Sequence, residues 1–169
     1  MLPEGKRITA GLYNTLHGYP LFNYVSYDTN KKASINVFIV GSGDVAIEAF
    51  KTIFWIGQVD KCKLNICLAS DSAKYYESTI KSIMPGLASF NNYANITYLD
   101  FDFTTLSNNI NAIKNSDFTY FVVATDTPKN NEKIAKVIKK ALSKSSSKIF
   151  IGIFTDNQIN KEEVYLQAT

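Results

Sequence analysis

Residues 35–50 read INVFIVGSGDVAIEAF, and this stretch decides the fold that the rest of the chain must follow. A short, strongly apolar run ends at Gly41 and Gly43, and a helix-type apolar pattern begins directly after them. This order predicts a β-strand, a tight turn and an α-helix. The spacing Gly41-x-Gly43-x-x-Ala46 is typical of the turn that holds the diphosphate of a dinucleotide.

Each small residue of this turn has a physical role in a dinucleotide site. Gly41 permits the sharp turn, Gly43 lets the main chain approach a diphosphate, and Ala46 lets the helix pack closely against the strand. The first turn of the helix offers unpaired N–H groups and a partial positive charge to an anion. The predicted ligand-binding residues of this loop are Gly41, Ser42, Gly43, Asp44, Val45 and Ala46.

Composition indicates an ordinary soluble globular protein, which we expect to be cytoplasmic. The 169 residues are 46% hydrophobic and 20% charged, and a net charge of +3 is too small to favour nucleic acid as a partner. No apolar run is long enough to cross a bilayer, and no signal-peptide pattern is present at the start of the sequence, so we expect no direct membrane insertion. With one histidine and two cysteines, free thiols at Cys62 and Cys67 are favoured over a disulfide or a zinc site.

Strand and helix patterns alternate along the rest of the chain, which predicts a parallel sheet covered by helices on both faces. We expect a three-layer α/β, Rossmann-like fold of strand order 3-2-1-4-5 over residues 35–169. A helix-like final segment favours the interpretation that the chain is part of a longer protein. The expected strands are 35–40, 63–69, 96–101, 118–124 and 148–154, and the expected helices are 44–55, 73–83, 105–114, 128–142 and 160–166.

Residues 1–34 form an aromatic-rich N-terminal extension in front of this domain. Residues 23–28 predict an added strand that turns through Thr29-Asn30-Lys31-Lys32 into the strand starting near Ser34. His17, between turn-forming residues, is interpreted as a turn or surface histidine in preference to a catalytic one.

In a sheet of this order, ligands bind at the carboxyl ends of the first and fourth strands. The fourth strand breaks at Thr125-Asp126-Thr127-Pro128, where Pro128 suits the first turn of a helix capped by Thr127 or Asp126. We therefore add Thr125 and Asp126 to the predicted site. The convergence of this break with the glycine loop carries more weight than the glycine motif alone.

The end of the second strand supplies a candidate ribose ligand. Ser70 and Asp71 follow it directly, and a carboxylate in this place binds the ribose 2′-OH of an adenosine. Asp71 or Ser70 also suits the N-cap of the helix that follows, and the two roles are compatible. Asp100 and Asp102 end the third strand, and we interpret them as polar loop groups near the ligand pocket.

These residues resemble the TrkA-N family, the Rossmann domain of regulator-of-potassium-conductance (RCK) proteins, over about Ile35 to Thr155. Phe101-Asp102-Phe103-Thr104 is similar to the family's Gly-Asp-x-Thr, with Phe101 in place of glycine. The segment from Ala124 to Asn131 is similar to the one after the family's fourth strand, with Thr127 where an acid is common. The resemblance implies binding of NAD(H) or another adenine nucleotide that is sensed rather than consumed. It also implies pairing with a second copy or with a membrane transporter.

The residues leave three classes of function open. A regulatory nucleotide-binding module is favoured, because no base–nucleophile pair is readable and few residues follow the fifth strand. The alternatives are the cofactor domain of an NAD-dependent oxidoreductase and a degenerate Rossmann domain that serves as a protein-interaction scaffold. Asp44 keeps the scaffold open, since it adds negative charge beside the proposed phosphate position. No catalytic residue and no metal ligand is assigned.

Overall fold

The computed structural model describes residues 20–90, 92–102, 113, 117–145, 147–155 and 158–159. His17, most of the predicted helix over 105–114 and the predicted helix over 160–166 lie outside these residues.

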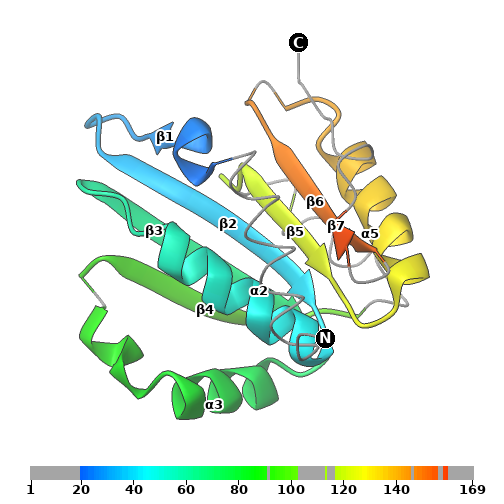
Figure 1. Ribbon diagram of the computed structural model, residues 1–169. Helices are drawn as coiled ribbons and strands as arrows, with labels where there is room; N and C mark the ends of the chain where they lie inside the picture. Colours follow the sequence, from blue (N-terminus) through cyan, green and yellow to red (C-terminus); the bar gives the residue numbers. More distant parts are fainter. Residues whose placement is uncertain are drawn as a thin grey trace.

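Strands and helices alternate over residues 33–100 and 120–155, as the sequence predicts (Figure 1). The parallel strands are β2 (Ala33–Gly41), β3 (Cys62–Ser70), β4 (Ala94–Asp100), β5 (Tyr120–Ala124) and β6 (Phe150–Thr155). The described helices are α2 (Gly43–Ile56), α3 (Ala73–Ile83) and α5 (Pro128–Ala141), with 3-10 turns η1 (Leu21–Tyr24) and η2 (Pro85–Phe90). Two short strands, β1 (Ser26–Tyr27) and β7 (Gln158–Ile159), complete the sheet.

The sheet has seven strands in the order β4-β3-β2-β5-β6-β7, with β1 pairing to β2 off this path. It extends the five predicted parallel strands at two places. β1 is the added strand expected before β2, whereas β7, which was not predicted, adds an antiparallel pair to β6. Counted along the chain from β2, its five parallel strands lie in the order third, second, first, fourth, fifth. Two-residue strands carry too little alternation to be read from periodicity.

The predicted hairpin at the start of β2 is confirmed, but its first strand is shorter than the expected 23–28, because η1 runs to Tyr24 and β1 covers only Ser26–Tyr27. Ser26 and Tyr27 pair with Ser34 and Ala33 across a turn. Asp28 fixes the turn, because its Oδ1 accepts hydrogen bonds from the main-chain N–H groups of Asn30 (2.9 Å) and Lys32 (2.8 Å).

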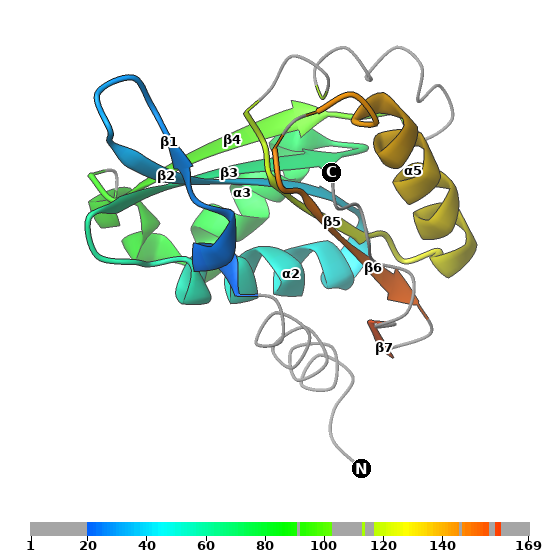
Figure 2. The same ribbon diagram turned by 90° about the horizontal axis from the view of Figure 1, so that it is seen from above.

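Helices cover both faces of the sheet, a layout consistent with a Rossmann-like fold. Figure 2 shows α2 and α3 on one side of the strands and α5 on the other. Alternate residues of β2 divide between the two cores: Val37 and Ile39 face α2, and Phe38 and Val40 face α5. All of β5 is buried, as the apolar run at 118–124 predicts, and the strand begins two residues later than that run.

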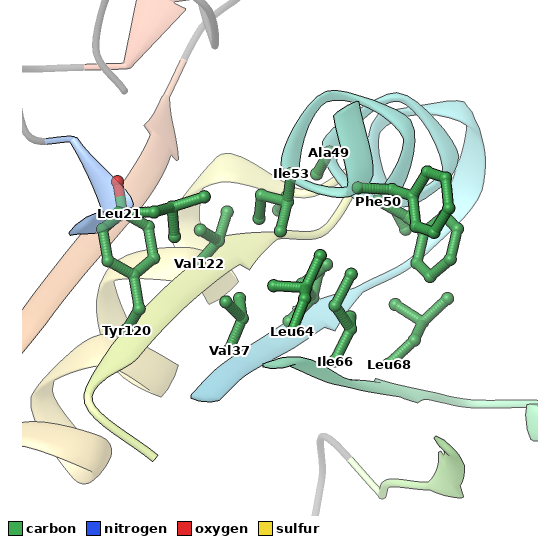
Figure 3. Packing of buried hydrophobic residues seen from close by; sticks show 14 of the residues in the cluster. Leu21, Val37, Ala49, Phe50, Ile53, Leu64, Ile66, Leu68, Tyr120 and Val122 are labelled. Atoms are coloured by element: carbon green, nitrogen blue, oxygen red, sulfur yellow. The ribbon is translucent and has the colours of Figure 1, made fainter. Parts of the chain in front are cut away.

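The core under α2 is packed from residues that lie far apart in the sequence. Phe50 and Ile53 of α2 lie over Ile66 and Leu68 of β3 and over β2, and Leu21 closes the other end (Figure 3). Complete burial of side chains of this size stabilises the fold by about 1.5–3 kcal/mol each. The helix ends at Gly57, whose N–H donates to the carbonyl of Ile53.

Gly41 determines how closely α2 approaches the sheet. A Cβ placed on Gly41 would lie 2.5 Å from the Cβ of Ala46 and 3.0 Å from the carbonyl oxygen of Ala124. The helix therefore begins against the end of β2, with no space for a side chain between them.

Replacing Gly41 by alanine is therefore expected to overpack this junction. We predict that Gly41→Ala lowers the free energy of unfolding by about 1–3 kcal/mol in urea denaturation. Gly86→Ala is the control, since a Cβ at Gly86 meets no atom within 4 Å. Equal stabilities of the two variants would contradict this account of the junction.

Candidate functional site

The loop between β2 and α2 lies at the carboxyl edge of the sheet, beside the end of β5. Gly41 pairs with Ala124 in the register of the two strands, and the N–H of Ser42 donates to the carbonyl of Ala124 (3.3 Å). Gly43 has φ +64°, a conformation that favours glycine. The predicted convergence of the glycine loop with Thr125 and Asp126 is confirmed.

Ser42 and Asp126 join the two strand ends directly. The Ser42 hydroxyl donates to Asp126 Oδ1 (2.8 Å), and the main-chain N–H of Asp126 donates back to Ser42 Oγ (3.2 Å). The same carboxylate lies against Gly43, because a Cβ built there would be 3.4 Å from Asp126 Oδ2. A negative charge of the chain itself therefore stands at the start of α2, where a helix favours an anion.

Tyr76 of α3 lies at the same loop. The N–H of Gly43 donates to Tyr76 Oη (2.6 Å), and the tyrosine is only 4% exposed. Burial raises the pKa of the Tyr76 hydroxyl, the bond from Gly43 lowers it, and the charges of Asp71 and Asp126 raise it, with a net upward shift. The hydroxyl therefore keeps its proton at neutral pH and occupies the N–H that the dinucleotide motif offers to a phosphate.

Ser70 ends β3 with a buried hydroxyl. The residue is fully buried, and within the described part of the chain its Oγ has no hydrogen-bond partner. Ser70 shares a strand face with Ile66 and Leu68, which pack in the core under α2. One register step beyond Val40–Ala69, it lies next to Gly41. A buried hydroxyl without a partner costs about 1–3 kcal/mol.

The start of α3 corrects the predicted capping role of Asp71 and Ser70. The N-cap is Ser72, without a side-chain hydrogen bond. The N–H of Ala73 instead donates to Asp100 Oδ1 from the end of β4 (2.7 Å). Asp71 itself is exposed directly after β3, and its predicted role as a ribose ligand stays a prediction.

Phe101 and Asp102, which directly follow β4, differ in burial. Phe101 is buried in the core on the α5 side, with its ring centroid 6.4 Å from that of Phe38. Asp102 is exposed beyond the strand.

Asn131 fixes the break after β5. It is fully buried, and its Oδ1 accepts from both the N–H (2.9 Å) and the hydroxyl of Thr125. Its Nδ2 donates to the carbonyls of Thr125 (3.1 Å) and Phe154 (2.7 Å). One side chain of α5 thus ties together the ends of β5 and β6 and holds Asp126 in place.

Pro128 begins α5, as predicted, but Thr127 at the N-cap forms no side-chain cap bond.

Three carboxylates act at or near the loop. Asp44 lies in the first turn of α2, and the charges of Asp71 and Asp126 both act on Tyr76. Among the described residues, ion pairs join Lys51 to Glu48 and Lys81 to Glu77, and no group of three or more metal-ligating side chains occurs.

A hollow of about 1050 Å³ lies at the opposite, amino edge of the sheet. Its walls come from the β1 hairpin, the segment before β5 and the end of α5, and they include Asp28, Asp117, Lys140 and Lys148. Lys148 Nζ is 4.9 Å from the centroid of the Tyr24 ring. This hollow contains none of the predicted site residues, and ligands of open α/β sheets bind at the carboxyl edge.

Tyr76 is the residue of this site that sequence reasoning missed. A signal for its burial was present, because Tyr76 and Ile80 are spaced by four residues and are both buried on one face of α3. The sequence contained no signal for the distant partner of its hydroxyl.

Comparison with models of known protein families gives no match, and neither the curated proteins nor the solved structures yield one. The resemblance to TrkA-N domains therefore stays a prediction from the residues. Among the described helices, none combines the length and apolar character that a bilayer-spanning segment requires.

Because Asn131 forms several buried hydrogen bonds, we predict that its substitution lowers the stability of the protein strongly. Asn131→Leu would leave the buried N–H and carbonyl of Thr125 and the carbonyl of Phe154 without their partner. We expect the free energy of unfolding to fall by about 2–5 kcal/mol in urea denaturation. Asn130→Leu, at the adjacent exposed position of α5, is expected to change it by less than about 0.5 kcal/mol. A loss shared equally by both variants would contradict the role of the buried amide.

Proposed function

We propose that the carboxyl edge at β2 and β5 is a regulatory site for NAD(H) or another adenine nucleotide. The observation that carries the proposal is the N–H of Gly43, which points out of a glycine loop at φ +64° and donates to an oxygen acceptor 2.6 Å away. A phosphate oxygen is an acceptor of the same kind, and the first turn of α2 favours its charge.

The rest of the nucleotide would extend along the ends of the neighbouring strands. The diphosphate would take the N–H groups of the loop between Gly41 and Ala46, and the ribose would reach Asp71 beyond β3. Asp71 is exposed at this edge, so its carboxylate is accessible to a ribose hydroxyl.

The contacts that a nucleotide would replace support a role in sensing the ligand rather than converting it. Tyr76 belongs to α3 and Asp126 to the segment before α5, and both contact the loop. Occupancy of the loop would therefore be coupled to two elements that present their outer faces to solvent. Such coupling is what a regulatory domain requires to transmit the presence of its ligand.

A protein-interaction scaffold is the second candidate, and one observation favours it. Two groups of the loop already have partners within the chain, since the Ser42 hydroxyl bonds Asp126 and the Gly43 N–H bonds Tyr76. A Rossmann-like domain that has lost its nucleotide would have such a closed loop.

Calorimetric titration with NAD(H), NADP(H), ATP, ADP and AMP separates these candidates. We expect at least one of these ligands to bind, and Gly43→Asp to weaken it by at least about tenfold, because a carboxylate would face the phosphate. A side chain at this positive φ is strained, but Asp is among the residues that adopt it most often. A Cβ at Gly43 would lie 3.4 Å from Asp126, so the variant is expected to fold with a lower free energy of unfolding. Gly86→Asp is the control. Absence of binding by every ligand would favour the scaffold.

The role of Asp71 is tested by the cofactor preference. We expect NAD(H) to bind more tightly than NADP(H), since a carboxylate repels a 2′-phosphate, and Asp71→Asn to reduce this preference by about tenfold. Asp60→Asn, an exposed change after α2, is expected to leave the preference unaltered. Tighter binding of NADP(H) to the wild-type protein would show that Asp71 does not hold the ribose.

A further inference from the structure

Two side chains of the protein occupy the place that the glycine loop offers to a ligand phosphate. Tyr76 Oη accepts the hydrogen bond of the Gly43 N–H at 2.6 Å. The Asp126 carboxylate bonds Ser42 through Oδ1, and its Oδ2 lies 3.4 Å from the position of a Cβ on Gly43. The loop is therefore closed by a neutral acceptor on one side and a negative charge on the other.

The charge of Asp126 acts differently on different ligands. A phosphate oxygen bonded to the Gly43 N–H would lie next to this carboxylate. Two like unit charges about 4 Å apart change an equilibrium constant by about fivefold even in bulk water, and by more where water is excluded. A nucleoside without a phosphate does not experience this repulsion.

The hydroxyl of Ser70 is an independent sign that the closed loop is not the only state of the site. It is fully buried without a partner in the described chain, on the strand face that α2 covers and next to Gly41. Tyr76 packs in the same core cluster as Leu68, two residues before Ser70. Outward movement of the Tyr76 ring would open this part of the cluster and give the Ser70 hydroxyl access to a polar ligand group.

We propose that Tyr76 and Asp126 form an autoinhibitory plug that selects the ligand by its phosphate charge. A phosphate must displace the Tyr76 hydroxyl from Gly43 and turn the Asp126 carboxylate away, whereas the sugar and base of a nucleoside need displace neither. This inference rests on the proposed nucleotide site and defines its regulation.

The test compares ADP with adenosine, both titrated by calorimetry. Asp126→Asn keeps an acceptor for Ser42 but removes the charge, so ADP affinity is expected to rise at least about fivefold, with adenosine changing less than about twofold. Tyr76→Phe keeps the ring and frees the Gly43 N–H, and ADP affinity is expected to rise about two- to tenfold. The matched controls are Asp60→Asn and Tyr75→Phe, since Tyr75 is an exposed neighbour on α3.

Unchanged ADP affinity in Asp126→Asn and Tyr76→Phe, or equal gains for ADP and adenosine, would overturn the plug. If neither ligand binds any variant, the proposed nucleotide site is wrong. Whether Tyr76 closes the loop is then tested separately, by NMR measurement of the amide hydrogen exchange of Gly43. Exchange that is faster in Tyr76→Phe than in Tyr75→Phe supports the closure of the loop by Tyr76. Equal exchange in these two variants overturns it.

Discussion

The close approach of α2 to the end of β2 is the constraint on which the site depends. With no side chain at Gly41, the Cβ of Ala46 and the carbonyl of Ala124 both press against the loop. The helix consequently begins at the sheet edge, and Gly43 adopts a positive φ. This geometry directs the Gly43 N–H toward Tyr76 and places the loop beside Asp126.

The loop that has the sequence pattern of a diphosphate site has two of its groups bonded by side chains of the protein itself. Rossmann-type loops bind phosphate because their main-chain N–H groups and helix dipole have no partner in the protein. Here Tyr76 takes the Gly43 N–H, and Asp126 brings a carboxylate to the helix start. Two interpretations of this arrangement are a regulated nucleotide site and a scaffold that has lost its ligand. They differ in whether the side chains of Tyr76 and Asp126 can move away from the loop.

The local structure was largely predictable from the sequence. The boundaries of α3 agree with the prediction, and the positions of α2, β3 and β5 agree to within about two residues, because apolar periodicity and the Gly57 and Pro128 signals are local. The two-residue strands β1 and β7 lie at the limit of what periodicity can report. Of these two strands, only β1 had a signal in the sequence, which was the turn at Thr29-Asn30-Lys31-Lys32 that follows it.

The contacts that define the site could not be predicted in the same way. Gly43 and Tyr76 are 33 residues apart, and Ser42 and Asp126 are 84 apart. The first pair exists only after α3 has docked, and the second only after β2 and β5 have paired. Asp100 replaces the expected local cap of α3 for the same reason, because β4 delivers it from a distant part of the chain. Sequence spacing identified the loop, but not the side chains that close it.

A crystal structure of the protein with ADP tests the central claim most directly. The account predicts a phosphate oxygen on the Gly43 N–H, with the Tyr76 hydroxyl displaced and the Asp126 carboxylate turned away from the loop. ADP seated in the hollow at the amino edge, or ADP bound at the carboxyl edge while Tyr76 Oη still accepts from Gly43, would contradict it.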